Sequence, residues 1–390
     1  MVSLFKWIEM EHSPFVFGTT VSKGSFANRE QDLERLYSNM LNGINSMLIS
    51  PRRWGKSSLV EKLILDVRQK NSKICVVSID LFSASSEEEF LELFAREVIK
   101  ASSTKWEDWM RAGKDFFQQL VPKLSIGLNP KVDFSITFDW KEIRKYRDEI
   151  LDLPERIARD KGVKYLICLD EFQNLASFDQ YEQMEKSMRA VWQRQKLVTY
   201  CLYGSRRHMM ADIFSNPSKP FYRFGEVILL EKIKREKWVD FILRKFEDGK
   251  KQLTPELARL IPEWMDDHSW YVQQLAHYTW QKSTKKVTLI NLQEALKELI
   301  ATNSPFYQRE VESLSRGQLN LLKAIANQEE KLTSVEIIDT YKLGTSANVV
   351  KNRRVLMNLD VIHEHHGRWD FLDPAFKLWF QNYFLQKPLY

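Results

Sequence analysis

Residues 50–57, with the sequence SPRRWGKS, combine side chains that can bind a phosphate chain. Gly55 lets the backbone approach an anion closely, Lys56 supplies a flexible cation, and the hydroxyl of Ser57 is a ligand for Mg²⁺. An apolar run at residues 46–49 precedes them and a helical pattern follows, so backbone N–H groups and a helix N-terminus face the phosphates. Ser50 replaces the first glycine of the G-x-x-x-x-G-K-[ST] pattern, and serine fits there if its φ is negative.

A second group of candidate residues follows another apolar run, at residues 164–169. Asp170 and Glu171 come directly after it. A strand that is buried on both faces of a parallel sheet has a continuous apolar sequence of this kind. Its C-terminal end lies in the crevice where phosphates bind. Asp170 therefore fits the carboxylate that holds Mg²⁺, and Glu171 is placed to polarise an attacking water. The alternatives are that Glu171 caps the next helix, or that the strand end and the glycine turn are unrelated.

These residues need a sheet to bring them together, and the chain has a βαβ pattern as far as residue 231. Strand patterns recur at residues 46–49, 74–80, 164–169, 198–203 and 226–230, with helical patterns at 26–43, 81–100 and 181–195. Strands that alternate with helices predict an α/β fold with a doubly wound parallel sheet. Residues 122–140 alternate around Asn129-Pro130, which predicts a β-hairpin insertion at the sheet edge.

The rest of the chain has two further patterns. Residues 232–305 contain only helical patterns, at 234–246, 254–268, 269–281 and 289–299, which predicts a helical lid. Residues 306–390 contain three helical patterns and then two short strands around Gly367, which is typical of a winged helix-turn-helix. The sequence thus predicts three domains, at residues 1–231, 232–305 and 306–390.

The composition is that of an ordinary folded protein with two or three domains. Of its 390 residues, 44% are hydrophobic and 28% are charged. No apolar run approaches the roughly 18 residues of a membrane span, and the N-terminus lacks the pattern of a secretory signal, so we expect no membrane partner. Cys75, Cys168 and Cys201 lie in apolar runs without metal-ligand spacing, which favours reduced thiols in a cytoplasmic protein.

The predicted winged helix has mixed evidence for binding DNA. Lys351, Arg353 and Arg354 lie in a stretch, residues 340–359, that contains no acidic residue, and cations on such a helix can contact phosphates. However, residues 311–390 contain 10 Lys and Arg and 9 Asp and Glu, a net charge of +1, whereas dedicated DNA-binding domains are usually more basic. The whole-chain charge of +6 permits contact with nucleic acid without requiring it. DNA and a protein both stay open as partners.

Several motifs together resemble the archaeal-type ATPase family, which are P-loop ATPases of the AAA+/STAND kind. The motifs are SPRRWGKSSL, LDEFQNL, GSRRHMM, KPFYRFG and DPAFKLWF. The resemblance extends from about Phe15 to about Phe384. It implies an AAA+ core, a helical lid and a C-terminal winged helix, with ATP and Mg²⁺ as ligands.

The resemblance also implies roles for individual residues. It assigns phosphate binding to a loop formed by Pro51, Arg52, Arg53, Trp54, Gly55, Lys56, Ser57 and Ser58. Asp170 and Glu171 take the Walker B roles, and Ser205 is expected to sense the γ-phosphate, with Arg206 sharing that work. Arg223 matches the neighbourhood that supplies an arginine finger in ring-forming relatives, and the alternative is an ordinary surface arginine.

Other positions leave alternatives open. Asn28 and Arg29 match a segment that lies beside the adenine in such folds, although an N-cap role suits Asn28 as well. Residues 268–274 contain no arginine where many AAA+ proteins place a second sensor, which favours slow turnover. In a homo-oligomeric ring Arg223 acts in trans, whereas in a monomer Arg206 or Arg207 lies nearest the phosphates.

The function predicted from these features is a slow, Mg²⁺-dependent ATPase that acts as a nucleotide-controlled switch. ATP binding and hydrolysis would be coupled through the winged helix to DNA or to a protein partner. The alternative is a nucleotide-loaded regulatory or scaffold module that does not hydrolyse ATP.

Overall fold

The computed structural model describes residues 12–19, 27–102, 144–365 and 367–390. Contacts divide the described chain into two compact units. One unit is Arg29–Glu231, and the other joins the described residues up to Asn28 with Lys232–Tyr390. The predicted hairpin at residues 122–140 lies outside the described residues, and the division into three domains stays a prediction.

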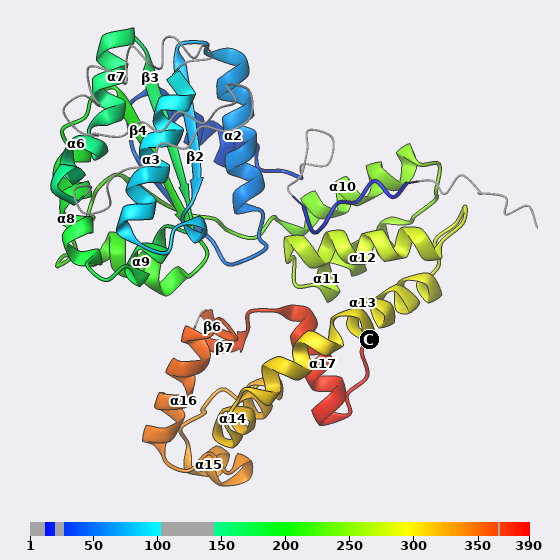
Figure 1. Cartoon of the computed structure of the whole chain (residues 1–390). Helices are drawn as coiled ribbons and strands as arrows, with labels where there is room; N and C mark the ends of the chain where they lie inside the picture. The colour runs from blue at the N-terminus through cyan, green and yellow to red at the C-terminus, as the bar shows by residue number, and fades with distance from the viewer. Residues whose placement is uncertain (1–11, 20–26, 103–143, 366) are drawn as a thin grey trace, which may run out of the picture. The chain divides into compact units, whose positions relative to one another are not determined.

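A five-stranded, fully parallel sheet forms the centre of the first unit (Figure 1). Its strands are β1 (Ser46–Ile49), β2 (Ile74–Asp80), β3 (Lys164–Asp170), β4 (Val198–Gly204) and β5 (Glu226–Leu229). They lie in the order β2-β3-β4-β1-β5. Every residue of β1 and β4 is buried, as expected of central strands with helices on both faces.

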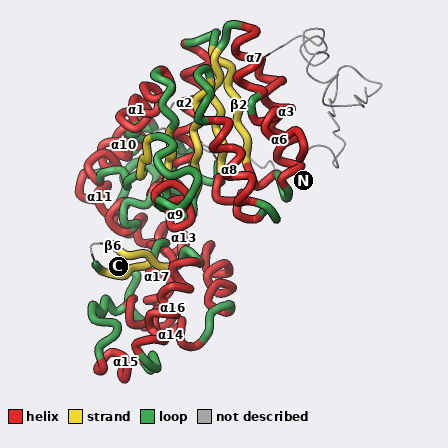
Figure 2. The backbone as a smooth tube through the Cα atoms, turned by 90° about the vertical axis from the view of Figure 1, so that its left-hand side faces the viewer, coloured by secondary structure: helices red, strands yellow, loops and turns green. Residues whose placement is uncertain are grey.

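Helices cover both faces of this sheet, and Figure 2 shows the strands in yellow between helices in red. Along β3, Tyr165, Ile167 and Leu169 enter one core, whereas Leu166 and Cys168 are buried on the opposite face. The helices of the first face are α3 (Glu87–Ser102), α6 (Arg147–Leu151), α7 (Leu153–Lys161), α8 (Tyr181–Trp192) and α9 (Arg207–Ser215). Helices α1 (Glu30–Leu41) and α2 (Lys56–Lys70) cover the other face.

The strand register brings the predicted site residues to one edge. Asp80 lies opposite Asp170 on the neighbouring strand, and Ile49 lies opposite Gly204. Because the strands are parallel, the residues that follow β1, β3 and β4 meet at the same carboxyl edge. Ser50, Glu171 and Ser205 therefore come close together although they are far apart in the sequence.

The second unit begins with helices α10 (Arg235–Asp248), α11 (Pro255–Trp264), α12 (Ser269–Lys282) and α13 (Leu289–Glu312). The predicted helix at residues 289–299 is too short, because α13 continues through Pro305. Proline removes one helical hydrogen bond, but buried side chains on both sides of Pro305 hold the helix in the core, among them Leu299 and Tyr307. The hydroxyls of Tyr307 and Tyr271 are 3.0 Å apart.

The C-terminal part of this unit has the elements of a winged helix. They are α14 (Arg316–Ala326), α15 (Val335–Tyr341), α16 (Ser346–Asn358), the antiparallel pair β6 (Ile362–His365) and β7 (Arg368–Phe371), and α17 (Pro374–Leu385). Ser315, Ser334 and Thr345 cap the three helices, each with a side-chain oxygen that accepts a backbone N–H. One hydrophobic core runs through α10–α17 and also includes Phe15.

Candidate functional site

The loop between β1 and α2 has the geometry predicted for a phosphate loop. Its sharpest turn is at Gly55, whose φ of +94° is rarely adopted by residues with a side chain, and α2 begins at the next residue, Lys56. Ser50 is not among the described residues with positive φ, so serine fits at the start of the loop without backbone strain. Its backbone N–H donates to the carbonyl of Gly204 at 3.4 Å, which ties the loop to the end of β4.

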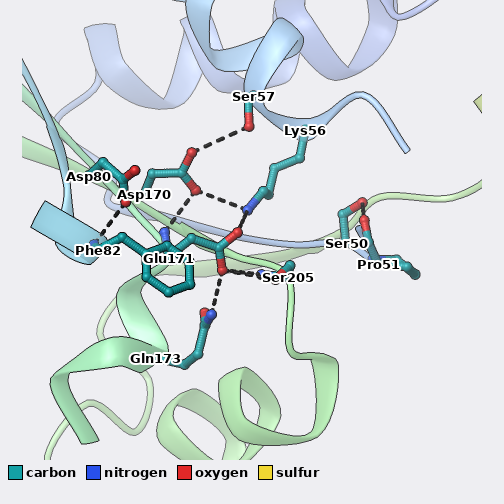
Figure 3. A network of polar contacts seen from close by, with 10 residues as sticks. All are labelled: Ser50, Pro51, Lys56, Ser57, Asp80, Phe82, Asp170, Glu171, Gln173 and Ser205. Carbon is teal, nitrogen blue, oxygen red and sulfur yellow. Dashed lines mark hydrogen bonds and ion pairs between the residues drawn. The ribbon is translucent and has the colours of Figure 1, made fainter. Parts of the chain in front are cut away.

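Lys56 and Ser57 both reach the end of β3 (Figure 3). The ammonium of Lys56 lies 3.0 Å from Oδ1 of Asp170 and 3.2 Å from Oε1 of Glu171. The hydroxyl of Ser57 donates to Oδ2 of Asp170 at 3.3 Å. The structure thus joins four predicted site residues from two separate motifs.

Glu171 is held on its other oxygen by groups from two further segments. Oε2 accepts the hydroxyl of Ser205 at 2.9 Å, the backbone N–H of Ser205 at 3.3 Å, and the amide of Gln173. Glu171 precedes the 3₁₀ helix η3 (Phe172–Ser177), but its side chain makes no capping hydrogen bond. Glu171 thus occupies the N-cap position of η3, as the alternative proposed, but its carboxylate belongs to the Lys56 cluster and does not cap the helix.

The two carboxyl groups have opposite pKa shifts. Burial raises the pKa of Asp170 above its usual value, even though Lys56 opposes this shift. Burial alone would also raise the pKa of Glu171, but Lys56, Gln173 and Ser205 stabilise the charged form and bring its pKa below the usual value. Glu171 is therefore the more firmly ionised of the two groups.

The oxygen donors here suit Mg²⁺. This ion prefers octahedral oxygen ligands, retains several waters, and is usually held by one or two protein groups together with substrate phosphates. The hydroxyl of Ser57 and the carboxylate of Asp170 lie side by side and form such a pair. Among the described residues no group of three or more His, Cys, Asp or Glu could hold a metal, so a cage built only from these side chains is not indicated there.

Arg29 supports the phosphate loop from α1. Its guanidinium is 7% exposed and donates to the carbonyl of Trp54 at 3.2 Å and to Asp32 at 3.2 Å. Arg29 occupies the N-cap position of α1, and Asn28 precedes it with a φ of +37°. The N-cap role considered for Asn28 is therefore wrong. The support that Arg29 gives to the loop was not predicted, because it depends on the packing of α1 beside the loop.

The other candidate arginines lie outside the Lys56 cluster. Arg223 is exposed, has a φ of +53°, and its guanidinium lies 5.2 Å from the ring centre of Tyr222. Arg206 is the N-cap residue of α9 and donates to the sulfur of Met209 at 3.7 Å, and Arg207 is exposed. In the described ranges, no hydrogen bond or ion pair connects these arginines to Asp170 or Glu171.

The remaining loop residues differ in exposure. Arg52 and Arg53 are exposed at the tip, whereas Pro51, Trp54 and Ser58 are buried. Sequence reasoning missed Gln173, although its place two residues after the Asp-Glu pair was a usable signal. Asp80 lies opposite Asp170, and its carboxylate accepts the backbone N–H of Phe82 at 2.9 Å.

The three cations predicted to contact DNA differ in their exposure on the winged helix. Lys351 and Arg354 are exposed on α16, whereas Arg353 is half-buried with its guanidinium 4.7 Å from the ring centre of Trp369. Arg353 therefore packs against the wing instead of facing outwards. In the described parts of the chain, no helix is both long and apolar enough to cross a membrane.

Comparisons with known proteins agree with this architecture. The family described as "Probable winged helix domain" matches residues 305–382. A solved structure of a Walker-type ATPase from Pyrococcus abyssi is 17% identical, with a TM-score of 0.66, and the match covers 92% of this chain and 97% of that one. The ORC2 protein of Aeropyrum pernix, in its ADPNP–ADP complexes, is 13% identical with a TM-score of 0.54, covering 91% of this chain and 93% of that one.

No curated protein matches the sequence. At these identities the structural matches show the fold, and they confirm the predicted fold class. This chain therefore shares the fold of these two solved structures, with a parallel-sheet core, and it carries a winged helix domain at residues 305–382.

Proposed function

We propose that this protein is a Mg²⁺-dependent ATPase that works as a nucleotide-controlled switch. The observation that carries the proposal is the meeting of Lys56 and Ser57 with Asp170 and Glu171 at the carboxyl edge of the sheet. Helix α2 begins at Lys56, so the positive end of its dipole favours an anion at the same place. Similarity in fold to a Walker-type ATPase, and to a protein solved with ADPNP and ADP, supports a nucleoside triphosphate as the ligand.

Each residue then has a chemical task. Lys56 binds the β- and γ-phosphates, and Ser57 and Asp170 are the protein groups that would hold Mg²⁺. When bound, the ion neutralises phosphate charge and polarises the phosphorus–oxygen bonds. Glu171 accepts a proton from the attacking water, and Ser205 holds the Glu171 carboxylate in place. Arg223 is the proposed arginine finger.

The proposed switch involves the partners of Lys56. Asp170 and Glu171 neutralise its charge, and its side chain is 6% exposed. A bound triphosphate offers more negative charge and draws Lys56 away from Glu171. The Oε1 atom of Glu171 then becomes free to accept a proton, so nucleotide binding and activation of the base are one event.

The partner is reached through the winged helix. We propose duplex DNA, contacted by Lys351 and Arg354 at the exposed face of α16, with Arg353 supporting the wing. The near-neutral charge of residues 311–390 makes a protein partner the second candidate. All three cysteines are free, which supports the proposed cytoplasmic location.

ATP hydrolysis measured with and without duplex DNA tests the proposal, with Lys56→Ala and Glu171→Gln as the matched variants. We expect slow turnover that DNA stimulates and that both variants lower by roughly 10²-fold or more, while Glu171→Gln still binds nucleotide. If the wild type is no faster than Glu171→Gln but binds ATP, the chain is the non-hydrolysing regulatory module. Turnover that is indifferent to DNA assigns the winged helix to a protein partner.

A further inference from the structure

We propose that Gln173 is a positioning residue that orients the carboxylate of Glu171 so that only Oε1 faces the reacting phosphate. This inference rests on the proposed ATP hydrolysis. It assigns a task to the glutamine of the LDEFQNL motif, which the proposed function has not used.

The contacts divide the two oxygens of Glu171 between different tasks (Figure 3). Oε2 accepts hydrogens from the side chain of Gln173 and from the hydroxyl and backbone N–H of Ser205. Oε1 instead lies 3.2 Å from the ammonium of Lys56, on the side where a phosphate would bind. A carboxylate held by three donors on one oxygen cannot rotate about its terminal torsion without losing them.

The amide of Gln173 has one reasonable orientation. An ionised carboxylate only accepts hydrogen bonds, so the NH₂ end of the amide must face Glu171. Gln173 is 1% exposed, and within the described ranges its Oε1 has no hydrogen-bond partner. A buried acceptor without a partner lowers stability, whereas leucine would fill the same space without that loss. Gln173 is therefore unfavourable for folding at this buried position, which indicates that it has a function at the Glu171 carboxylate.

Gly204 makes the room that this amide occupies. A Cβ atom at Gly204 would lie 2.0 Å from Oε1 of Gln173 and 2.7 Å from the sulfur of Met210. Gly204 is the last residue of β4, directly before Ser205. Because backbone and amide approach closely, the two residues that donate to Oε2, Gln173 and Ser205, can come from the segments that follow β3 and β4.

The orientation matters for the chemical step. A water transfers a proton to Oε1 of Glu171 while its oxygen forms a bond to the γ-phosphorus. The bond from that phosphorus to the β–γ bridging oxygen breaks, and its electron pair leaves with ADP. Proton transfer needs the acceptor oxygen within hydrogen-bond reach of the water, so a carboxylate free to rotate would be in the productive orientation less often.

Substitution of Gln173 by leucine tests the proposal, with Gln180→Leu as the matched control at an exposed position. We expect Gln173→Leu to lower kcat about tenfold, which is less than the roughly 10²–10⁴-fold that a general base contributes, because the base is misplaced and not removed. KM and the affinity for a fluorescent ATP analogue should not change, because Gln173 does not contact the phosphate loop.

Thermal unfolding provides a readout independent of activity. Leucine removes both the buried acceptor without a partner and the hydrogen bond to Glu171, and these two effects on stability oppose each other. We therefore expect a small change in Tm, which shows that the loss of kcat does not come from unfolding. Gly204→Ala should displace the amide and reproduce the loss of kcat. If Gln173→Leu does not fold, Gln173→Met tests the same point, because methionine has a similar length and lacks the amide that donates to Glu171.

A double-mutant cycle separates this proposal from the proposed function. In a Glu171→Gln background, Gln173→Leu should have no further effect on the residual rate, because both residues act through one carboxylate. An unchanged kcat in Gln173→Leu, or an additive loss in the double variant, would overturn the positioning role while ATP hydrolysis stands. Absence of hydrolysis in the wild type would instead overturn the proposed function itself.

Discussion

The hydroxyl of Ser205 donates to Oε2 of Glu171 at 2.9 Å, from the end of one strand to the end of its neighbour. Ser205→Ala removes this donor but keeps the backbone N–H, which lies 3.3 Å from the same oxygen. We expect kcat to fall about tenfold without a change in KM, because only orientation of the base is weakened. Steady-state ATPase assays beside Ser215→Ala, an exposed position, provide the comparison. Equal kcat values in both variants would exclude Ser205 from the reaction.

Arg223 combines an exposed side chain with a strained backbone. Its φ of +53° lies in the left-handed region, which is unfavourable for residues other than glycine. Arg223→Gly should therefore raise Tm relative to Arg223→Ala, while both variants lose the guanidinium. If Arg223 is an arginine finger, both should bind ATP normally and hydrolyse it about 10³-fold more slowly.

The assembly state decides how Arg223 acts. A finger supplied by a second copy makes the specific activity of the wild type rise with protein concentration. Mixing Arg223→Ala with Lys56→Ala should then restore activity, since each variant lacks a different half of the shared site. Normal hydrolysis by Arg223→Ala would instead identify it as a surface arginine.

Glu185 gives a pH-dependent prediction away from the site. It is 2% exposed on α8, and within the described ranges its Oε2 has no hydrogen-bond partner. Burial raises its pKa above the usual value, although Lys219 partly offsets this. A carboxyl whose pKa is higher in the folded protein than in the unfolded chain is more easily protonated in the folded protein. As the pH rises through these two pKa values, the free energy of unfolding therefore decreases.

Glu185→Gln should accordingly raise Tm by a few degrees at pH 7–8, since a change of about 1 kcal/mol shifts Tm by roughly 2–4 °C in a domain of this size. The difference should shrink as the pH approaches 4, where the wild-type carboxyl is protonated. Differential scanning calorimetry across this range, with the exposed Glu182→Gln as control, measures the effect. A constant difference at every pH would contradict the assigned cause.

The exposed cations of α16 should contribute to DNA binding, whereas the half-buried Arg353 should not. Lys351→Glu with Arg354→Glu should weaken binding to duplex DNA at least tenfold and reduce the slope of log K against log salt by about 2, as expected for two lost phosphate contacts. Arg353→Ala should leave this slope unchanged, because Arg353 packs on Trp369. Fluorescence anisotropy at several salt concentrations measures both effects. Unaltered binding by the double variant would exclude α16 as the DNA-binding surface.

Much of the core could be predicted because its signals are local. The phosphate loop lies within one strand–loop–helix unit, so Gly55 and Lys56 were recognisable from neighbours in the sequence. The apolar run before Asp170 likewise identified a buried strand and its polar end. Since parallel strands share a carboxyl edge, these two local predictions were enough to bring Lys56 and Asp170 together.

The missed features depend on how distant segments pack. Gln173 reaches Glu171 because Gly204 leaves space on the neighbouring strand, and no local pattern encodes that space. Arg29 contacts the Trp54 carbonyl only after α1 has packed beside the loop. Helix α13 was predicted to end at Leu299, yet it continues through Pro305, because burial of Tyr307 outweighs one lost hydrogen bond.

The uninterrupted course of α13 has a mechanical consequence. Its 24 residues form a rod of about 36 Å at 1.5 Å per residue. The hydroxyl contact between Tyr271 and Tyr307, and the contact of Tyr271 with Asp373 before α17, tie this rod to α12 and to the C-terminal helix. Both ties lie within one hydrophobic core, so α12, α13 and the winged helix are held together by buried contacts. A displacement of α12 would therefore be passed directly to the winged helix instead of being absorbed by a loop.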